Sequence, residues 1–413
     1  MESKVKDLSA YEERFHEDPA SFSDFMASDY VKELKNQGKE DKAIEVGRTF
    51  MQVSPELKGY INHYGYALYN RFINIDEDKI NEREELFYSI LDEIAKVCKQ
   101  ERYSPLEAAV NRAIKHITRK TPVDYKKFSE VLDYLDAPTL DEKPFVNKEG
   151  KEFESKKEKW FRMKVRALYE IGEYNECLEK ANIALASTLK WHYNNLNWVK
   201  YYRGCSLVEL KRYEEAENEF LSLKDRFNAV DFTSILYKLY LNTDRLNDAY
   251  TYLIYDFFLN GFDYKHMGSY ESLAAMAKEK EQKKAEELAR ALVYKLKQEH
   301  GEELTDETLA EYESKEASEI FDRLYSEIMD HLDAYIKREE GKVVYYNADH
   351  EYGSIYQDGE DNLFFRQADY IYDEEVQKYD VVEFSRIKTY DRKHDRASSK
   401  AILLKTLYEE IRY

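Results

Sequence analysis

Cysteine, proline and glycine are scarce in this chain of 413 residues, which holds 3, 6 and 13 of them. Three cysteines (Cys98, Cys177 and Cys205) are too few for a disulfide framework or a four-cysteine metal site, and they are typical of a reducing compartment. The longest apolar stretches, such as Leu253–Phe262, contain polar residues and fall short of the ~20 residues of a membrane span. The first residues contain no apolar stretch for a secretory signal, so we expect a cytoplasmic protein.

Positive charge is also in deficit, because 63 lysines and arginines face 83 acidic residues, for a net charge of -20. This balance argues against a protein that coats nucleic acid by charge alone, since phosphate binding needs clustered Lys and Arg. General disorder is excluded as well, because 43% of the residues are hydrophobic and 15% are aromatic. At roughly 150 residues per domain, the chain is long enough for two or three domains.

A chain with little Gly and Pro and much Glu, Lys, Leu and Ala is predicted to be mostly α-helical. The clearest helix pair lies in Trp160–Leu185, where Gly172 follows an apolar-faced helix and allows the left-handed turn that ends it. Ala181 and Ala184 lie on the apolar face of the second helix, where two helices can approach closely. Cys177 lies on the same face, so we expect a buried structural thiol rather than a nucleophile.

The same pattern recurs along the chain, with Lys211 and Asp244 at turn positions 33 residues apart. Near the N-terminus, Gly38 and Pro55 fit one more unit. These segments resemble tetratricopeptide repeats, whose unit is ~34 residues. The resemblance implies a helical solenoid whose concave surface binds a protein partner. The alternative is a set of ordinary helical hairpins in a bundle without repeats.

Changes of pattern divide the chain into predicted parts. The stretch 136–159 holds prolines, a glycine and many charges and is predicted to be a linker, whereas Ser272–Glu299 and Asp306–Arg338 are predicted to be long amphipathic helices, the second with Asp306 as N-cap. The predicted parts are an N-terminal helical part (1–135), the linker (136–159), the repeats (160–271), capping helices (272–338), a barrel (339–406) and a tail (407–413).

From Gly341 onward the helical period gives way to alternation. The runs GKVVYYN, GSIYQ, NLFFRQADY, DVVEFSRIK and KAILLK are short, rich in β-branched and aromatic residues, and separated by polar turns. Five such strands in ~65 residues predict a small five-stranded all-β barrel.

This segment resembles a cold-shock domain, a barrel of the OB type that binds single-stranded nucleic acid. The family's opening Gly-Lys-Val-Lys-Trp-Phe-Asn stretch corresponds to Gly341–Asn347, its first ribonucleoprotein motif to His350–Ile355, and its second to Leu363–Arg366. The resemblance implies that the aromatic residues at the matching positions stack on bases, which is worth ~1–3 kcal/mol per base. Three stacking positions stay aromatic in this chain: Tyr345, Tyr352 and Phe364.

Other positions depart from the family pattern. A basic residue is replaced by His350, a glycine by Glu351, one stacking aromatic by Ser354 and a histidine by Arg366, which can stack and pair with phosphate. Residues 386–405 hold seven Lys and Arg against two Asp, and Arg392–Arg396 is the predicted loop before the last strand. The residues that we predict to bind nucleic acid are Lys342, Tyr345, Tyr352, Phe364, Arg366, Arg392, Lys393 and Arg396.

Catalytic patterns are missing from the sequence. It contains no Gly-rich phosphate loop, no Gly-x-Ser-x-Gly, no His-Glu-x-x-His and no Cys-x-x-Cys. The cluster Trp191–Asn195 is polar and aromatic; it is either a binding edge or a helix cap that packs on its neighbour. We therefore predict no enzyme activity, no cofactor and no metal.

The predicted function is that of an adaptor, in which the solenoid binds a protein and the barrel binds single-stranded RNA or DNA. By analogy the combination suggests a bacterial protein of RNA metabolism, stress or defence. One alternative is a pure protein-interaction scaffold whose barrel has lost nucleic-acid binding, as Glu351 and Ser354 would indicate. Another is a nuclease or nucleotidyl accessory domain hidden in residues 60–135.

Overall fold

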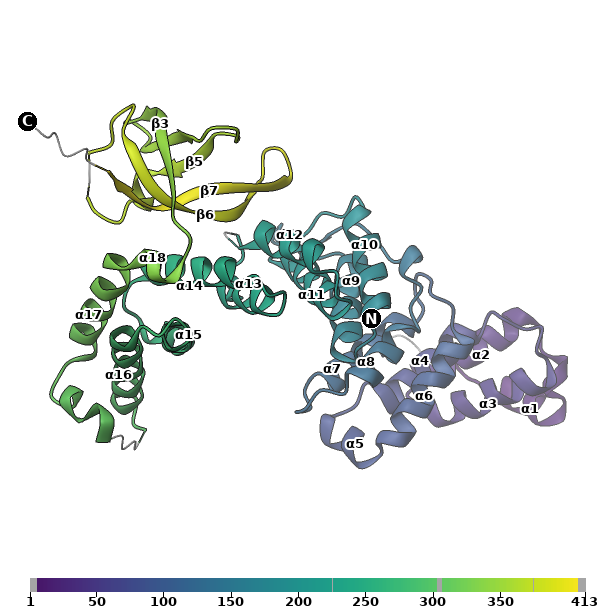
Figure 1. Cartoon of the computed structure of the whole chain (residues 1–413). Coiled ribbons are helices and arrows are strands. Elements are labelled where there is room, and N and C mark those ends of the chain that lie inside the picture. Colours follow the sequence, from purple (N-terminus) through teal and green to yellow (C-terminus); the bar gives the residue numbers. More distant parts are fainter. Residues whose placement is uncertain (1–5, 225, 303–306, 374, 408–413) are drawn as a thin grey trace, which may run out of the picture. The chain divides into compact units, whose positions relative to one another are not determined.

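The computed structural model describes residues 6–224, 226–302, 307–373 and 375–407. The chain divides into two compact units, Met1–Tyr202 and Arg203–Tyr413, and the boundary falls inside helix α11 (Asn195–Glu209), within the predicted repeats. Helices make up most of the chain and a five-stranded β-barrel follows them, so the predicted fold class is confirmed (Figure 1). Across the described ranges, no helix is both long enough and apolar enough to pass through a membrane.

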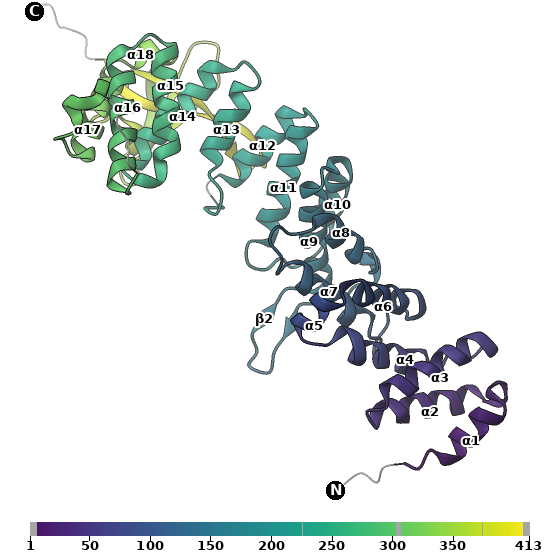
Figure 2. The ribbon, with the colours of Figure 1, turned by 90° about the horizontal axis from the view of Figure 1, so that it is seen from below.

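The first unit consists of helices that pair with their neighbours along the chain, as α2 and α3 do (Figure 2). Its core is apolar and rich in aromatic residues; Phe50, Tyr60 and Tyr64 are almost wholly buried there. Its α-helices are α1 (Ser9–Glu17), α2 (Asp24–Asn36), α3 (Glu40–Val53), α4 (Ile61–Leu68), α5 (Glu77–Glu82), α6 (Glu84–Val97), α7 (Leu106–Ile117), α8 (Tyr125–Leu132), α9 (Lys156–Glu170), α10 (Tyr174–Ala186) and the first part of α11.

The segment predicted to be a linker contains regular structure. Strands β1 (Phe145–Val146) and β2 (Glu152–Phe153) form a two-stranded antiparallel hairpin, and α9 begins at Lys156. His192 joins this hairpin to α9, because its Nδ1 lies 2.7 Å from Glu158 Oε2 and its Nε2 lies 2.7 Å from Glu152 Oε1. The Trp191–Asn195 cluster therefore packs on its neighbours through His192.

The second unit continues the helical hairpins. Its α-helices after α11 are α12 (Tyr213–Leu223), α13 (Phe232–Leu241), α14 (Leu246–Asn260), α15 (Met267–Glu279), α16 (Lys283–Glu299), α17 (Ala317–Asp330) and α18 (Leu332–Tyr335). The prediction of one long helix over Ser272–Glu299 is wrong, because Lys280–Gln282 form a turn with Glu281 at φ 57° and the chain folds back as α16.

The predicted helix over Asp306–Arg338 is also shorter than expected. Tyr312 is fully buried and its hydroxyl donates to Glu287 of α16 at 2.6 Å, so the chain is tied down there instead of continuing as one helix. The 3-10 helix η5 (Glu307–Tyr312) ends at this residue, and α17 begins at Ala317. The predicted N-cap Asp306 and the tail residues 408–413 lie outside the described residues.

Successive helical hairpins share one turn geometry. Lys211 and Asp244, the predicted turn positions, have φ of 59° and 56°, in the left-handed region that Gly172 also adopts (φ 83°). At each turn the next amide donates to a carbonyl five residues earlier, as in Arg212 N–Leu207 O (2.8 Å), which is the Schellman arrangement of a helix end. The turn at Glu281 repeats the pattern. The helical part is therefore repeat-like in its local geometry.

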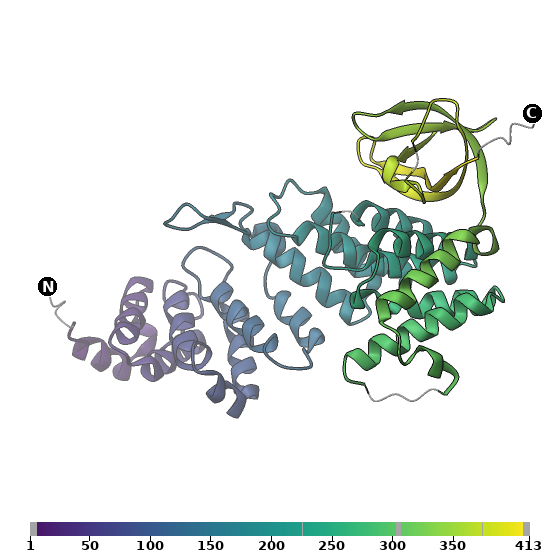
Figure 3. The same ribbon diagram turned by 90° about the vertical axis from the view of Figure 1, so that its left-hand side faces the viewer.

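The last strands form a closed barrel in the order β3-β4-β5-β7-β6, in which only β5 and β7 run parallel among the described pairs. The five-stranded barrel that the alternating runs predict is therefore present. Figure 3 shows the strands closing into a barrel. Its interior is filled by buried side chains such as Val343, Ile355, Phe365, Phe384 and Leu404. The strands are β3 (Glu339–Asn347), β4 (Tyr352–Tyr356), β5 (Leu363–Arg366), β6 (Val381–Asp391) and β7 (Arg396–Thr406).

Polar contacts fix the barrel to α14 within the second unit. The hydroxyl of Tyr252 donates to the carbonyl of Lys388 on β6, and that of Tyr255 donates to Asp369 Oδ1 at 2.5 Å. Asn247 Oδ1 accepts from the backbone amide of Lys337 at 2.7 Å. Strands β6 and β7 are thus the side of the barrel that lies against α12 and α14 (Figure 1).

Candidate nucleic-acid interface

Strands β3, β4 and β5 place the three predicted stacking residues on the outer face of the barrel. Tyr345 is opposite Ser354, and Ser354 is opposite Phe364. Tyr352 lies two residues before Ser354 and therefore faces the same side of β4. The exposed fractions of Tyr345 and Phe364 are 46% and 40%, so both rings are open to solvent.

These rings form one continuous group, which we call the aromatic row: Tyr345, Tyr352, Phe364 and His350. The ring centres of Tyr345 and Tyr352 are 6.0 Å apart, and those of Tyr352 and Phe364 are 5.8 Å apart. His350 stacks on Tyr352, with ring centres 6.4 Å apart and an interplanar angle of 24°. Such a row offers several ring faces to successive bases of a single strand.

Two departures from the cold-shock pattern lie beside the row. Glu351 occupies the turn between β3 and β4 with φ 54°, a conformation that glycine adopts at less cost. Its carbonyl accepts from the amide of Gln367 at 2.8 Å, and its side chain is exposed. Ser354 lies between Tyr345 and Phe364, so the row has a hydroxyl where the family has an additional ring.

A hollow of about 730 Å³ adjoins the row, between the barrel and helices α12 and α14. Phe364 and Arg366 belong to its lining, and Lys400 on β7 is opposite Phe364 in the strand register. Of the described residues that line it, five are cationic and two are carboxylates. We call it the basic cleft; its cations are Lys224, Arg366, Lys388, Arg392 and Lys400, and its carboxylates are Asp369 and Asp391.

The cleft floor is held by buried polar contacts. Asp369 accepts from Lys400 Nζ at 2.9 Å, from the Tyr255 hydroxyl and from the backbone amide of Arg366 at 2.8 Å. Lys388 Nζ lies 3.2 Å from Glu217 of α12, whose carboxylate is almost wholly buried. Burial alone would raise the pKa of Glu217, but Arg245 and the Tyr240 hydroxyl hold it below the ordinary value, so the carboxylate stays charged.

Arg366 follows Phe364 on β5 and is opposite Tyr352 on β4. Its side chain is exposed, and its guanidinium makes no ion pair with any residue in the described ranges. It is thus positioned to approach a phosphate of a strand that is stacked on Tyr352 and Phe364.

The predicted basic loop is a tight turn between β6 and β7. The Asp391 carboxylate organises it by accepting from the amides of Lys393 (3.0 Å) and His394 (3.3 Å) and from His394 Nδ1 (2.7 Å). The hydrogen bond from His394 lowers the pKa of Asp391. Arg392 lines the basic cleft, whereas Lys393 and Arg396 are exposed outside its lining.

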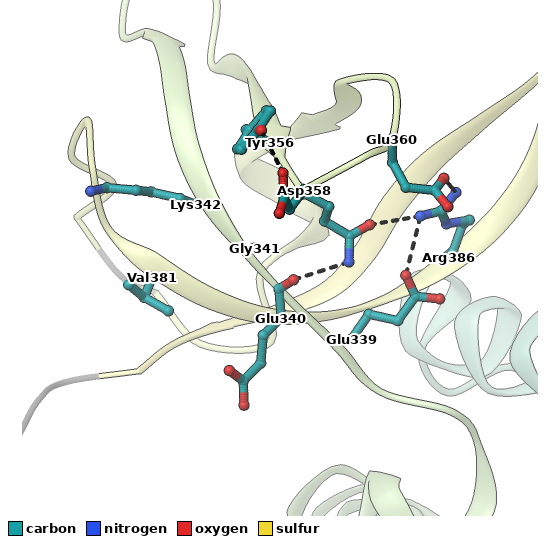
Figure 4. A pocket seen from close by; sticks show the side chains of 10 residues that line it. Glu339, Glu340, Gly341, Lys342, Tyr356, Asp358, Glu360, Val381 and Arg386 are labelled. Atoms are coloured by element: carbon teal, nitrogen blue, oxygen red, sulfur yellow. Dashed lines mark hydrogen bonds and ion pairs between the residues drawn. The ribbon is translucent and has the colours of Figure 1, made fainter.

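Lys342, which is also predicted to bind nucleic acid, lines a different hollow. We call this hollow of about 620 Å³ the acidic pocket, because Glu339, Glu340, Asp358 and Glu360 line it with Arg386 (Figure 4). The Lys342 side chain points away from these carboxylates, and its ammonium lies 5.2 Å from the centre of the Tyr379 ring. The structure thus does not bring Lys342 to the aromatic row.

Sequence reasoning missed Lys224, Tyr252 and Tyr255, which the helical part contributes to the basic cleft. They precede the barrel by more than 80 positions, and nothing in their local pattern marks them as other than helix residues. Lys388 and Lys400 belong to the basic run at 386–405, and that run was the available signal for them. Within the described ranges, no group of three or more His, Cys, Asp or Glu side chains could hold a metal ion.

Comparisons with known proteins give little that bears on this interface. No protein family matches the chain, and no curated protein matches it. The chain is similar to a solved structure described as "Structure of Naa15/Naa10 bound to HypK-THB", with 14% sequence identity and a TM-score of 0.21. The alignment covers 79% of this chain and 55% of that chain, so this chain spans just over half of its length.

Proposed function

We propose that this protein is a non-catalytic adaptor whose barrel binds single-stranded RNA or DNA and whose helical part binds a protein partner. The observation that carries the nucleic-acid part is the exposed aromatic row, which leads directly to Arg366 and a cleft with more cations than carboxylates. Bases stack on Tyr345, Tyr352 and Phe364, and Arg366 contacts phosphate; the β6–β7 turn adds the exposed cations Arg392, Lys393 and Arg396. Three stacked bases would contribute ~3–9 kcal/mol before the cost of ordering the strand.

The local charge supports this assignment in a chain whose net charge is -20. A strand is repelled at long range by such a protein, so binding must rest on short-range stacking and on a few well-placed cations. The row and its adjoining cations provide both on one face of the barrel. Binding is therefore expected to weaken with salt, but less steeply than for a protein that binds through charge alone.

The test is a titration of fluorescein-labelled single-stranded RNA and DNA with the intact protein, followed by fluorescence anisotropy. We expect micromolar or tighter binding, and a loss of about 100-fold in the Tyr352→Ala/Phe364→Ala double variant, since two ring faces are removed. The matched control is Tyr356→Ala/Tyr379→Ala, which removes two exposed rings of the same barrel outside the row.

Equal losses in both double variants, or no binding by the unmodified protein, would contradict the stacking role. The second result would favour the scaffold alternative, in which the barrel is a protein-binding module. Glu351 favours this alternative. Its exposed carboxylate lies next to Tyr352 in the sequence and would repel a phosphate bound there.

Exposed apolar residues support the protein-binding part of the proposal. Phe145 and Val146 on β1 are 64% and 54% exposed, on a hairpin that projects from the helices of the first unit (Figure 2). We expect a partner captured by the intact protein from its native cells to be lost with Phe145→Ser/Val146→Ser. Retention of the partner by that variant would place its binding surface elsewhere.

A further inference from the structure

We propose that the Ser354 hydroxyl makes the aromatic row selective, by forming a hydrogen bond with the ribose 2′-hydroxyl or the base edge of the nucleotide that stacks above it. This inference rests on the proposed function of the row and deepens it, because it names the residue that chooses among nucleotides. Both partners are neutral hydrogen-bonding groups of a nucleotide, and pairs of oligonucleotides distinguish them.

The first argument is the position of Ser354 at the centre of the row. Its partners across the sheet are Tyr345 on β3 and Phe364 on β5. Its two neighbours on β4 are buried, so the alternation of the strand turns Ser354 to the outer face together with Tyr352. A serine side chain is much shorter than a tyrosine or a phenylalanine. The hydroxyl therefore lies at the base of the row, with rings on three sides.

The second argument is that this hydroxyl has hydrogen-bonding capacity left. Ser354 is half-buried, and its hydroxyl makes no hydrogen bond within the described parts of the chain. The tyrosine hydroxyls of the row are already engaged. That of Tyr345 accepts from Asn347 Nδ2 at 3.4 Å, and a hydrogen bond with Tyr345 raises the pKa of Tyr352. Since Phe364 has no polar side-chain atom, Ser354 is the group that remains to bind a nucleotide at this point.

The third argument is the effect of a stacked strand on this hydroxyl. In the free protein a half-buried hydroxyl can bond to water. A base that lies across Tyr345 and Phe364 covers Ser354 and displaces that water. Because a polar group that is buried without a partner costs free energy, a nucleotide that offers a donor or an acceptor here is favoured over one that does not. A site that hydrogen-bonds one group of its ligand rejects analogues that lack this group.

The fourth argument is the difference between a hydroxyl and a ring at this position. A ring would add one more stacking face, and every base satisfies a stacking face because every base has a π-face of its own. A hydroxyl binds only groups that donate or accept a hydrogen bond. The row thus combines rings that accept any base with one group that does not.

The experiment measures the affinity of the intact protein for three fluorescein-labelled nonamers by anisotropy. Oligouridine and oligodeoxyuridine differ only in the 2′-hydroxyl, whereas oligodeoxyuridine and oligodeoxycytidine differ only in the base edge. We expect the unmodified protein to prefer one member of at least one pair by about 3- to 10-fold, the equivalent of one hydrogen bond. Ser354→Ala should bring this ratio close to one. Ser354→Thr keeps the hydroxyl and should keep the ratio.

Two further variants complete the set. Ser354→Phe replaces the hydroxyl by a ring, so it should raise the affinity for all three nonamers and abolish the preference. Ser398→Ala removes a half-buried serine hydroxyl on β7, outside the row, and is the control that should leave both ratios unchanged. A ratio lost in Ser354→Ala identifies the partner: the 2′-hydroxyl for the first pair of nonamers, and the base edge for the second.

Three results would overturn the inference and leave the proposed function standing. They are equal affinity of the unmodified protein for all three nonamers, unchanged ratios in Ser354→Ala, and a Ser354→Thr variant that behaves like Ser354→Ala. In each case a loss of binding in Tyr352→Ala/Phe364→Ala would still show that the row binds the strand. If the unmodified protein binds none of the nonamers, the proposed function and this inference fail together.

Discussion

The basic cleft and the acidic pocket belong to the same small barrel, yet they use their charges in opposite ways. In the acidic pocket, Arg386 is enclosed by its own chain: its guanidinium contacts Glu360 at 2.9 Å, Glu339 at 3.2 Å and Gln357 at 2.6 Å. In the basic cleft the enclosed group is a carboxylate: Asp369, 3% exposed, accepts from Lys400 Nζ at 2.9 Å and from the Tyr255 hydroxyl at 2.5 Å. The comparison teaches that two hollows of one barrel enclose groups of opposite charge, which the net charge of the chain does not reveal.

The largest expected effect is the loss of single-strand affinity when a positive charge in the basic cleft is reversed. Arg366→Glu places a carboxylate beside Tyr352, where it repels the phosphates of a stacked strand. We expect single-strand affinity to fall about 100-fold. The same reversal in the acidic pocket, Lys342→Glu, should change affinity less than about threefold, and anisotropy titrations of both variants measure the difference. Equal losses would mean that the two hollows do not differ in function.

The next largest effect concerns stability at the cleft floor. Asp369→Asn removes the charge that pairs with Lys400, and the Asp369 side chain is 3% exposed. We expect this change to destabilise the barrel by about 2–3 kcal/mol, since the half-buried ammonium of Lys400 loses its buried carboxylate partner. Hydrogen exchange at the amides of β7 measures this free energy.

The matched change in the acidic pocket is Glu360→Gln. Its side chain is 55% exposed, so the Arg386 pair is screened by solvent and should contribute under about 0.5 kcal/mol. A loss for Glu360→Gln that equals the loss for Asp369→Asn would show that the difference in burial between the two pairs has no energetic consequence.

A smaller effect is expected from pH in the acidic pocket. Burial alone would raise the pKa of Glu339, but the charge of Arg386 and a hydrogen bond from Gln357 hold it below the ordinary glutamate value. Because the folded state has the lower pKa, Glu339 stabilises the barrel above pH ~4.3, and this contribution is lost as the pH falls through the folded-state pKa. Urea unfolding between pH 7 and pH 3 should show a weaker acid dependence for Glu339→Gln. Parallel curves for the two proteins would contradict this role.

The smallest expected effect is the change in single-strand affinity when Lys342 is neutralised. Neutralising it with Lys342→Gln should change single-strand affinity less than about twofold, because the structure places this side chain by Tyr379 rather than in the aromatic row. Arg366→Gln is the matched neutralisation in the basic cleft and should cost about tenfold. Anisotropy titrations with one oligonucleotide compare the two directly. A larger loss for Lys342→Gln than for Arg366→Gln would reverse the assignment of the two hollows.

The sequence allowed the local features of the fold to be predicted. The alternating runs after residue 341 gave the five strands, and the repeat frame gave Lys211 and Asp244 as turn residues, where the backbone does adopt positive φ. It did not allow the turn at Lys280–Gln282 to be predicted. Glu281 is neither glycine nor asparagine, and the apolar stripe continues on both sides of it.

The candidate site was accessible to sequence reasoning only in part. The row could be inferred because its members lie on consecutive strands at positions that match a known pattern. The basic cleft could not, because Lys224 and Tyr255 reach it only through the packing of α12 and α14 on β6 and β7. Lys342 was predicted to bind nucleic acid from its position in the first strand. That position does not reveal that carboxylates line the hollow next to it.

The most direct test of the central claim is ultraviolet crosslinking of a 5-iodouracil-substituted single strand to the intact protein, with the crosslinked residues mapped by mass spectrometry. We predict crosslinks at Tyr345, Tyr352 and Phe364, because rings that stack on bases lie within reach of the photoactivated carbon. Crosslinks confined to residues outside β3, β4 and β5, such as Tyr356 or Tyr379 beside the acidic pocket, would contradict the account.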